Sequence, residues 1–176
     1  MTTPVGDEFE IRGFAPHDAA GVRELFMRVN RLLAPPDMKD VFEAYIARSL
    51  DEEIDRVSDY YREREGGFWV AVDSGKIVGI FGLEASGDDA MELRRMYVDP
   101  DMRRRGIARK MLRFAEEECG RRGRSRMVLS TSEVQQEALA LYRNAGYELV
   151  REEVAAAASN KTVGGGIRRY HFNKVL

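Results

Sequence analysis

The sequence predicts an α/β (α+β) fold built on one mixed sheet. Three segments, 68–72, 76–83 and 91–98, are rich in strand-forming residues and follow one another across short turns, which favours antiparallel pairing. The third leads through Pro100 and Gly106 into a helix and then a strand at 127–130, and such a crossover joins parallel strands. These connections argue against a doubly wound parallel sheet and favour a mixed one.

The N-terminal third is predicted to be mainly helical. Residues 1–8 are expected to form a loose terminus, followed by a short strand at 9–12. Asp18 is a suitable N-cap for a helix that Pro35 and Pro36 end, and its apolar face comprises Val22, Leu25, Phe26, Val29 and Leu33. A second helical region covers about 39–65, and it is one helix or two, divided near 49–52.

The C-terminal half supplies the remaining elements. The helix that starts at Gly106 is predicted to end near Gly123, and a further helix covers about 134–144. Strands at 147–154 and 167–175 close the sheet, and their connection, rich in alanine and glycine, is predicted to be a mobile loop.

Composition fits a folded protein of one domain, 1–176. Of its 176 residues 44% are hydrophobic and 33% are charged, and the net charge of −2 argues against a nucleic-acid partner. No apolar run of about 18 residues and no secretory signal occur, so no membrane partner is expected. The lone Cys119 fits a cytoplasmic location, and a monomer or a homodimer is expected. His17 and His171 lack companions, so no metal site is predicted.

An anion site is predicted where three consecutive arginines precede Gly106. Free backbone N–H groups and the positive end of a helix dipole would lie there beside Arg103, Arg104 and Arg105, which suits a phosphorylated ligand. An ordinary solvated run of charges is the alternative. The sequence has neither a Gly-Lys-Ser/Thr phosphate loop nor a G-x-G-x-x-G motif.

Two motifs in order resemble those of the GNAT acetyltransferases. The first, Arg103-x-x-Gly106-x-Ala108, follows a strand that ends in Tyr97-Val98-Asp99-Pro100, and the second is Ala138-x-x-Leu141-Tyr142-x-x-x-Gly146-Tyr147. The resemblance covers about 67–150. It implies a GNAT fold, with six to seven strands, a splayed parallel pair and about four helices, and it implies acetyl-CoA as co-substrate. By resemblance, the cofactor contacts are Met96, Tyr97, Val98, Arg103, Arg104, Arg105, Gly106, Ile107, Ala108, Arg109, Gln135 and Tyr142.

The resemblance also implies two catalytic residues. Glu92 lies eleven residues before Arg103, where many relatives carry a glutamate proposed as general base, acting directly or through water. Strand alternation predicts that Glu92, Arg94, Met96 and Val98 share one face. A surface carboxylate paired with a neighbouring arginine is the alternative. By resemblance, the Val98 N–H is the oxyanion donor.

Tyr142 matches the family tyrosine that lies near the thioester sulfur. A phenol with a pKa of about 10 would protonate a leaving thiolate whose thiol has a pKa of about 8.5 at modest cost. The alternative is a core tyrosine, because Tyr142 shares an apolar stripe with Ala138.

Together these features predict an N-acetyltransferase that moves acetyl directly from acetyl-CoA to a primary amine. A non-catalytic acyl-CoA sensor is the alternative. Within the enzymes, transfer of an acyl group longer than acetyl is a further alternative. One segment resembles the camello-type branch of the family: Ser130-Thr131-Ser132 followed by Gln135-Gln136. Gln135 stands where the family often has asparagine. The acceptor stays open between small amines and peptide or protein amines. Residues 39–65 and Gly164–Gly166 are expected to frame it.

Overall fold

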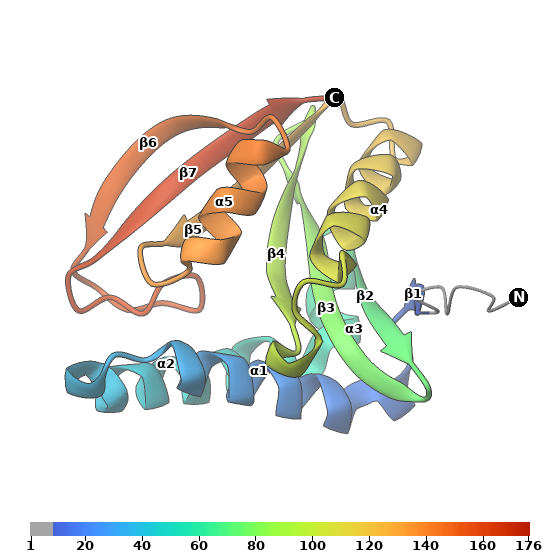
Figure 1. The fold of residues 1–176 in the computed structure, drawn as a ribbon. Helices are drawn as coiled ribbons and strands as arrows, with labels where there is room; N and C mark the ends of the chain where they lie inside the picture. Colours follow the sequence, from blue (N-terminus) through green and yellow to red (C-terminus); the bar gives the residue numbers. More distant parts are fainter. Residues whose placement is uncertain (1–8) are drawn as a thin grey trace, which may run out of the picture.

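The computed structural model describes residues 9–176, and the predicted loose terminus, 1–8, lies outside the described residues. The strands form one seven-stranded sheet in the order β1-β2-β3-β4-β5-β7-β6 (Figure 1). Every neighbouring pair is antiparallel except β4 and β5, which are parallel, so the prediction of a mixed sheet is confirmed. The strands are β1 Glu10–Gly13, β2 Gly67–Asp73, β3 Lys76–Ser86, β4 Ala90–Val98, β5 Arg126–Ser132, β6 Glu148–Ala155 and β7 Ile167–Val175.

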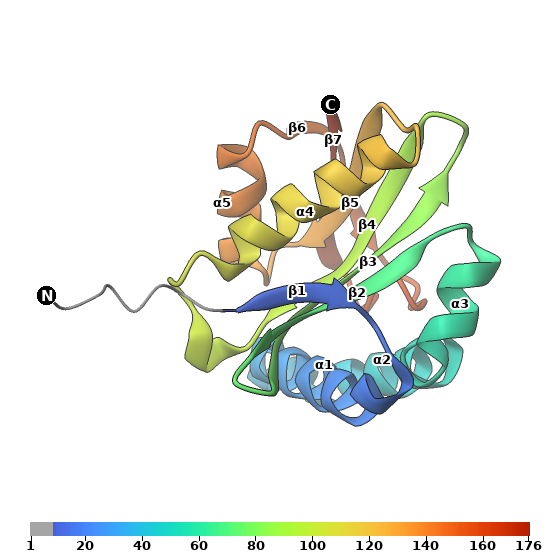
Figure 2. The same ribbon diagram turned by 90° about the vertical axis from the view of Figure 1, so that its right-hand side faces the viewer.

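Helices cover both faces of the sheet (Figure 2). α4 and α5 lie on one face, where Met91 and Leu93 of β4 pack with Met111 and Ala115 of α4. The other three helices lie on the opposite face, where Phe26 of α1 belongs to a second apolar cluster. The helices are α1 Ala19–Leu33, α2 Lys39–Glu52, α3 Val57–Glu63, α4 Ile107–Arg121 and α5 Gln136–Asn144. No helix within residues 9–176 is long and apolar enough to cross a bilayer.

The parallel pair of strands diverges after a short run of pairing. β4 and β5 are in register only from Ala90 opposite Arg126 to Leu93 opposite Leu129. Beyond that point β5 pairs only with β7, and β4 only with β3. Figure 1 shows the two parts of the sheet separating toward α1 and α2. The expected splay is therefore present, and it leaves one edge of β4 without a neighbouring strand.

A bulge in β4 corrects the predicted alternation. Gly82 of β3 lies opposite Arg94 but Ile80 lies opposite Tyr97, so β4 carries one extra residue. Arg95 takes up the irregularity with a φ of 57°. As a result Met96 and Val98 pack on the α4 side, whereas Arg94 and Arg95 face the side of α2 and α3. The expectation that Glu92, Arg94, Met96 and Val98 share one face is wrong for Met96 and Val98.

The helical region 39–65 is divided, and the division occurs at Glu53. α2 ends at Glu52, a 3₁₀ turn covers Ile54–Arg56, and α3 follows. The backbone of Glu53 leaves the helical conformation with a φ of −140°. Its side chain is fully buried, so the break carries a carboxylate into the interior.

The connection between β6 and β7, predicted to be mobile, is in contact with α2 and β4. Arg48 of α2 donates a hydrogen bond to the carbonyl of Ala158 at 2.6 Å. The carbonyl of Asn160 accepts hydrogen bonds from Arg94 at 3.2 Å and from Arg95 at 2.6 Å. These contacts hold the connection, residues 156–166, over the bulged part of β4.

Candidate functional site

A pocket of about 630 Å³, here called the larger pocket, lies between the splayed end of β4, the start of α4 and α5. Eleven of the twelve residues predicted to bind the cofactor line it, and only Arg105 does not: the eleven are Met96, Tyr97, Val98, Arg103, Arg104, Gly106, Ile107, Ala108, Arg109, Gln135 and Tyr142. Arg105 instead contacts Asp73 at 3.5 Å and the sulfur of Met102 at 3.3 Å. The structure thus brings together three segments that are separated in the sequence.

The turn before α4 is fixed by a buried carboxylate. Asp99 is 1% exposed, accepts a hydrogen bond from the backbone N–H of Asp101 at 2.9 Å, and forms an ion pair with Arg28 at 3.0 Å. The backbone then reaches Gly106, whose φ of 77° lies in the left-handed region. The first N–H groups of α4 have no partner within the helix, so they can bind an anion. Arg103 lies nearby, within 3.4 Å of Glu137.

A second cavity, of about 70 Å³ and here called the smaller cavity, adjoins the larger pocket. Met96, Tyr97, Gln135 and Tyr142 line both spaces, so they form the boundary between them. The other residues of the smaller cavity come from α2, β4, β5, the connection 156–166 and β7, and they are Tyr45, Glu92, Leu93, Arg94, Arg95, Ser130, Thr131, Asn160, Lys161 and Arg169. Two ligands bound in the two spaces would meet at this boundary.

Glu92 lines the smaller cavity and not the larger pocket. Its carboxylate lies 2.8 Å from Nζ of Lys161, and the same Nζ lies 2.9 Å from Glu84. Its partner is therefore a lysine from the connection 156–166, not a neighbouring arginine. Burial acts to lower the pKa of Lys161, but Glu92 and Glu84 outweigh it and the pKa is raised. Lys161 stays charged, and it holds the carboxylate of Glu92 in place.

Tyr142 is a buried core residue that also lies on the boundary between the two spaces. Its side chain is 5% exposed and its ring contacts those of Tyr147 and Phe172, with centroids 5.8 and 6.3 Å away. It also lines both the larger pocket and the smaller cavity. Burial raises the pKa of Tyr142 well above that of a free phenol. Tyr142 is thus neutral at pH 7, and it is a weaker acid than the sequence alone suggested.

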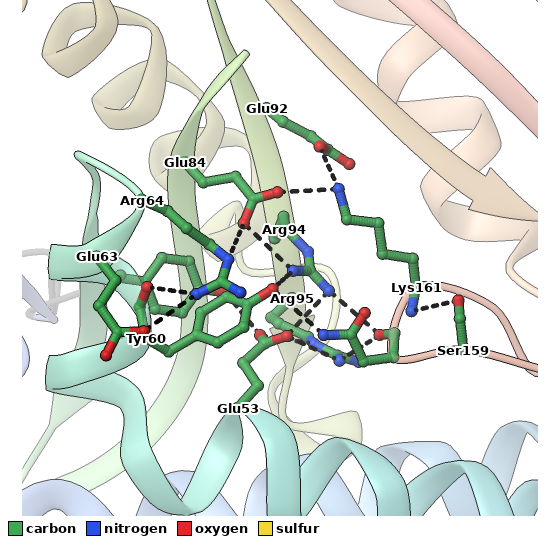
Figure 3. Close-up of polar contacts among 12 residues, drawn as sticks. Glu53, Tyr60, Glu63, Arg64, Glu84, Glu92, Arg94, Arg95, Ser159 and Lys161 are labelled. Carbon is green, nitrogen blue, oxygen red and sulfur yellow. Dashed lines mark hydrogen bonds and ion pairs between the residues drawn. The ribbon is translucent and has the colours of Figure 1, made fainter.

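The sequence reasoning missed a buried ionic cluster beside the smaller cavity (Figure 3). Glu53 lies 2.9 Å from Arg94 and 2.9 Å from Arg95, and it accepts a hydrogen bond from the hydroxyl of Tyr61 at 2.7 Å. Burial acts to raise the pKa of Glu53, but Arg95 and Arg94 lower it further, so the carboxylate is charged. The available signal was the adjacent pair Arg94-Arg95 inside a strand of mainly apolar residues, because adjacent buried arginines require a buried acid.

The residues considered for a metal do not converge. His17 is beside Asp18 at 3.4 Å, whereas His171 contacts Glu153 at 2.7 Å. Within residues 9–176 no three His, Cys, Asp or Glu side chains form a group that could hold a metal ion.

Comparison with known families decides the family. The sequence model of the Acetyltransferase (GNAT) family matches residues 32–147, which is well over half of the chain. The chain belongs to the GNAT family. The matched range contains the bulged strand, the turn at Gly106 and Tyr142, and every residue that lines the larger pocket except Val29 lies within it.

This GNAT chain is similar to curated N-acetyltransferases of vertebrates. N-acetylaspartate synthetase from Danio rerio is 35% identical over 116 residues, which are 65% of this chain and 41% of that protein. Probable N-acetyltransferase family 8 member 5 from Mus musculus is 33% identical over 123 residues, which are 67% of this chain and 52% of that protein. The family 8 relative agrees with the camello-type resemblance of the sequence. The chain spans less than two thirds of the length of these curated relatives.

A solved GNAT structure shows the same fold. The PaiA N-acetyltransferase from Thermoplasma acidophilum, in complex with coenzyme A, superposes with a TM-score of 0.73 over 96% of this chain and 99% of that chain. The two sequences are 16% identical, so the fold is shared although the side chains largely differ.

Proposed function

We propose that the chain transfers an acetyl group from acetyl-CoA directly to the primary amine of a small molecule, a peptide or a protein. The observation that carries this proposal is that the larger pocket and the smaller cavity share Met96, Tyr97, Gln135 and Tyr142. A thioester bound in the larger pocket and an amine bound in the smaller cavity would meet at these residues. This arrangement supports a ternary complex without a covalent enzyme intermediate.

Two features support acetyl-CoA as the donor. The free N–H groups at the start of α4, with Arg103, Arg104 and Arg109 on the same pocket wall, suit the pyrophosphate. The part of β4 after Leu93 has no neighbour on the β5 side, so the backbone of Met96 to Val98 can bond the pantetheine amides as a strand would. The PaiA N-acetyltransferase of Thermoplasma acidophilum, which shares the fold, is itself in complex with coenzyme A.

The chemistry needs a neutral amine, an oxyanion donor and a proton for the thiolate. The amine nitrogen attacks the thioester carbonyl, the new C–N bond forms, and the C–S bond breaks. Glu92 takes the proton of the amine, directly or through a water, and the Val98 N–H stabilises the oxyanion. Tyr142 then donates its phenolic proton to the leaving thiolate of CoA and recovers it from solvent. Because burial raises the pKa of Tyr142, this transfer is less favourable than from a free phenol.

The experiment that tests the function is release of free CoA from acetyl-CoA in the presence of a panel of amines. Release that depends on the amine, with an acetylated product of matching mass, supports the enzyme. The name N-acetylaspartate synthetase supports including amines of amino-acid size. The ion pair of Glu92 with Lys161 at 2.8 Å favours one alternative, a non-catalytic acyl-CoA sensor. Tight binding of acetyl-CoA without acetylation of any amine would support the sensor.

A further inference from the structure

Four cationic side chains line the smaller cavity, and three of them have a carboxylate partner. Arg94 and Arg95 share the buried Glu53, each at 2.9 Å. Lys161 lies between Glu84 and Glu92, as Figure 3 shows. The fourth is Arg169 of β7. These three pairings leave Arg169 to be explained.

Arg169 has no such partner. Its guanidinium donates one hydrogen bond, from Nη2 to the hydroxyl of Ser130 at 2.9 Å. No carboxylate of residues 9–176 lies within ion-pair distance of it. Glu153, its register neighbour on β6, contacts His171 at 2.7 Å instead. A guanidinium carries five N–H donors, so most of the donors of Arg169 are available to a ligand.

The burial of Arg169 makes it unfavourable for its guanidinium to lack a nearby anion. Arg169 is partly buried, and burial lowers its pKa from the ordinary value although Tyr45, Tyr97 and Glu153 act in the opposite direction. For Arg95 burial acts in the same direction, but Tyr45 and Glu53 outweigh it and the pKa lies well above the ordinary value. A cation that is removed from water without a counter-ion is unfavourable unless a ligand supplies one. Arg169 is therefore suited to an anion that enters the cavity.

We infer that Arg169 binds a carboxylate of the acceptor, so that the acceptor is an amino acid or a peptide whose carboxylate lies close to its amine. This inference rests on the proposed function. Planar guanidinium and carboxylate groups form paired hydrogen bonds, which a flexible ammonium such as Lys161 cannot reproduce. The volume of about 70 Å³ suits a compact group of this kind. Because Arg169 and Tyr142 line the same cavity, a carboxylate at Arg169 leaves the amine free to point toward the boundary with the larger pocket.

The test compares amino acids with their α-amides, which keep the amine and the shape but remove the negative charge. The twenty L-amino acids and the matching amides are screened with acetyl-CoA by CoA release, and kcat/KM is measured for the best pairs. In the unmodified protein the acid is expected to exceed its amide by about 10²-fold. Arg169→Gln should lower kcat/KM for the acid by a similar factor and leave the amide within about threefold. Arg169→Lys should recover part of the loss.

The neighbouring arginine of β7 provides a matched control. Arg168 is 45% exposed and forms an ion pair with Glu152 at 3.3 Å, away from the smaller cavity. Arg168→Gln removes the same charge, so it should leave the ratio of acid to amide unchanged. The affinity for acetyl-CoA and the Tm should stay constant in all the variants, which separates a local effect from unfolding.

The outcomes separate the inference from the function on which it rests. If amines are acetylated but the acid and the amide react equally well, or Arg169→Gln leaves their ratio unchanged, the carboxylate site is overturned and the proposed function stands. If no amine is acetylated, the proposed function fails, and the same pairs are titrated into the CoA-bound protein by calorimetry. Binding that prefers the acid and is lost in Arg169→Gln supports the site, whereas equal or absent binding overturns it.

Discussion

Glu92 of β4 and Lys161 form an ion pair with 2.8 Å between carboxylate and ammonium, although 69 residues separate them in the sequence. The same ammonium contacts Glu84 on the adjacent strand β3. The residue proposed as general base is therefore held by the connection between β6 and β7. An acceptor ammonium that enters the smaller cavity has to share Glu92 with Lys161 or reach it through water.

Glu92→Gln should lower kcat/KM by about 10²-fold, because it removes the proposed base. The loss should be largest at low pH, where most of the amine is protonated. Lys161→Met is the matched control, since it breaks the same ion pair but keeps the carboxylate. Kinetics and melting temperatures are measured for both variants. An equal loss in both would assign the effect to the ion pair, and full activity in Glu92→Gln would remove Glu92 from the mechanism.

Tyr142→Phe should lower kcat by about 10²-fold while the affinity for acetyl-CoA changes little. The ring contacts with Tyr147 and Phe172 persist in phenylalanine, so the Tm should be nearly unchanged. The effect should grow with pH, because solvent replaces a neutral acid less readily in alkaline solution. A pH–rate profile together with calorimetry checks this prediction. An unchanged kcat would show that Tyr142 has a packing role only.

Gly106→Val should abolish binding of acetyl-CoA, because a β-branched residue at a φ of 77° strains the turn and places atoms where phosphate would approach. A Cβ at Gly106 meets no atom within 4 Å, so overpacking is not the cause. Gly123→Val, at the other end of α4, is the control, with a φ of 72° and equally open surroundings. The Tm should fall similarly in both, and the calorimetric affinity only in Gly106→Val. Unchanged affinity in a folded Gly106 variant would falsify the placement of the pyrophosphate.

Glu53→Gln should destabilise the fold by about 3–5 kcal/mol, because Arg94 and Arg95 would lose their shared buried acid. The pKa of Glu53 is lowered in the folded state from its ordinary value of 4.5. Its stabilising contribution is therefore complete above pH 4.5 and is lost as the pH falls through the lowered folded value. Denaturant unfolding at pH 7 and pH 4 should show a weaker pH dependence in the variant. Equal stability of variant and parent at pH 7 would contradict the role of the cluster.

The parts that the sequence predicted well depend on local patterns. Strand alternation and turn residues indicated the mixed sheet. The segment from Arg103 to Ala108 indicated one wall of the larger pocket, because this segment forms a single turn and the start of the helix that follows. Arg105 was the exception: it does not line the pocket, because its side chain contacts Asp73 at the end of β2, far away in the sequence.

The parts that could not be predicted depend on contacts between distant segments. The bulge at Arg95 follows from a register shift against β3, and no alternation pattern within β4 contains it. Glu53 reaches Arg95 over 42 residues, and Lys161 reaches Glu92 over 69. Such pairs become visible only when the helices and the connection 156–166 are placed on the sheet.

The division of the site into two spaces with one shared boundary separates two kinds of evolutionary change. The walls of the larger pocket come mainly from 96–109 and 134–142, whereas Tyr45, Lys161 and Arg169 of the smaller cavity belong to other segments. Exchanging α2, the connection 156–166 or the start of β7 would alter the lining of the smaller cavity and leave the main walls of the larger pocket unchanged. On the proposed function, replacing these segments would change the acceptor, and a library confined to them would sample acceptor choice while the residues proposed to bind the donor stay the same.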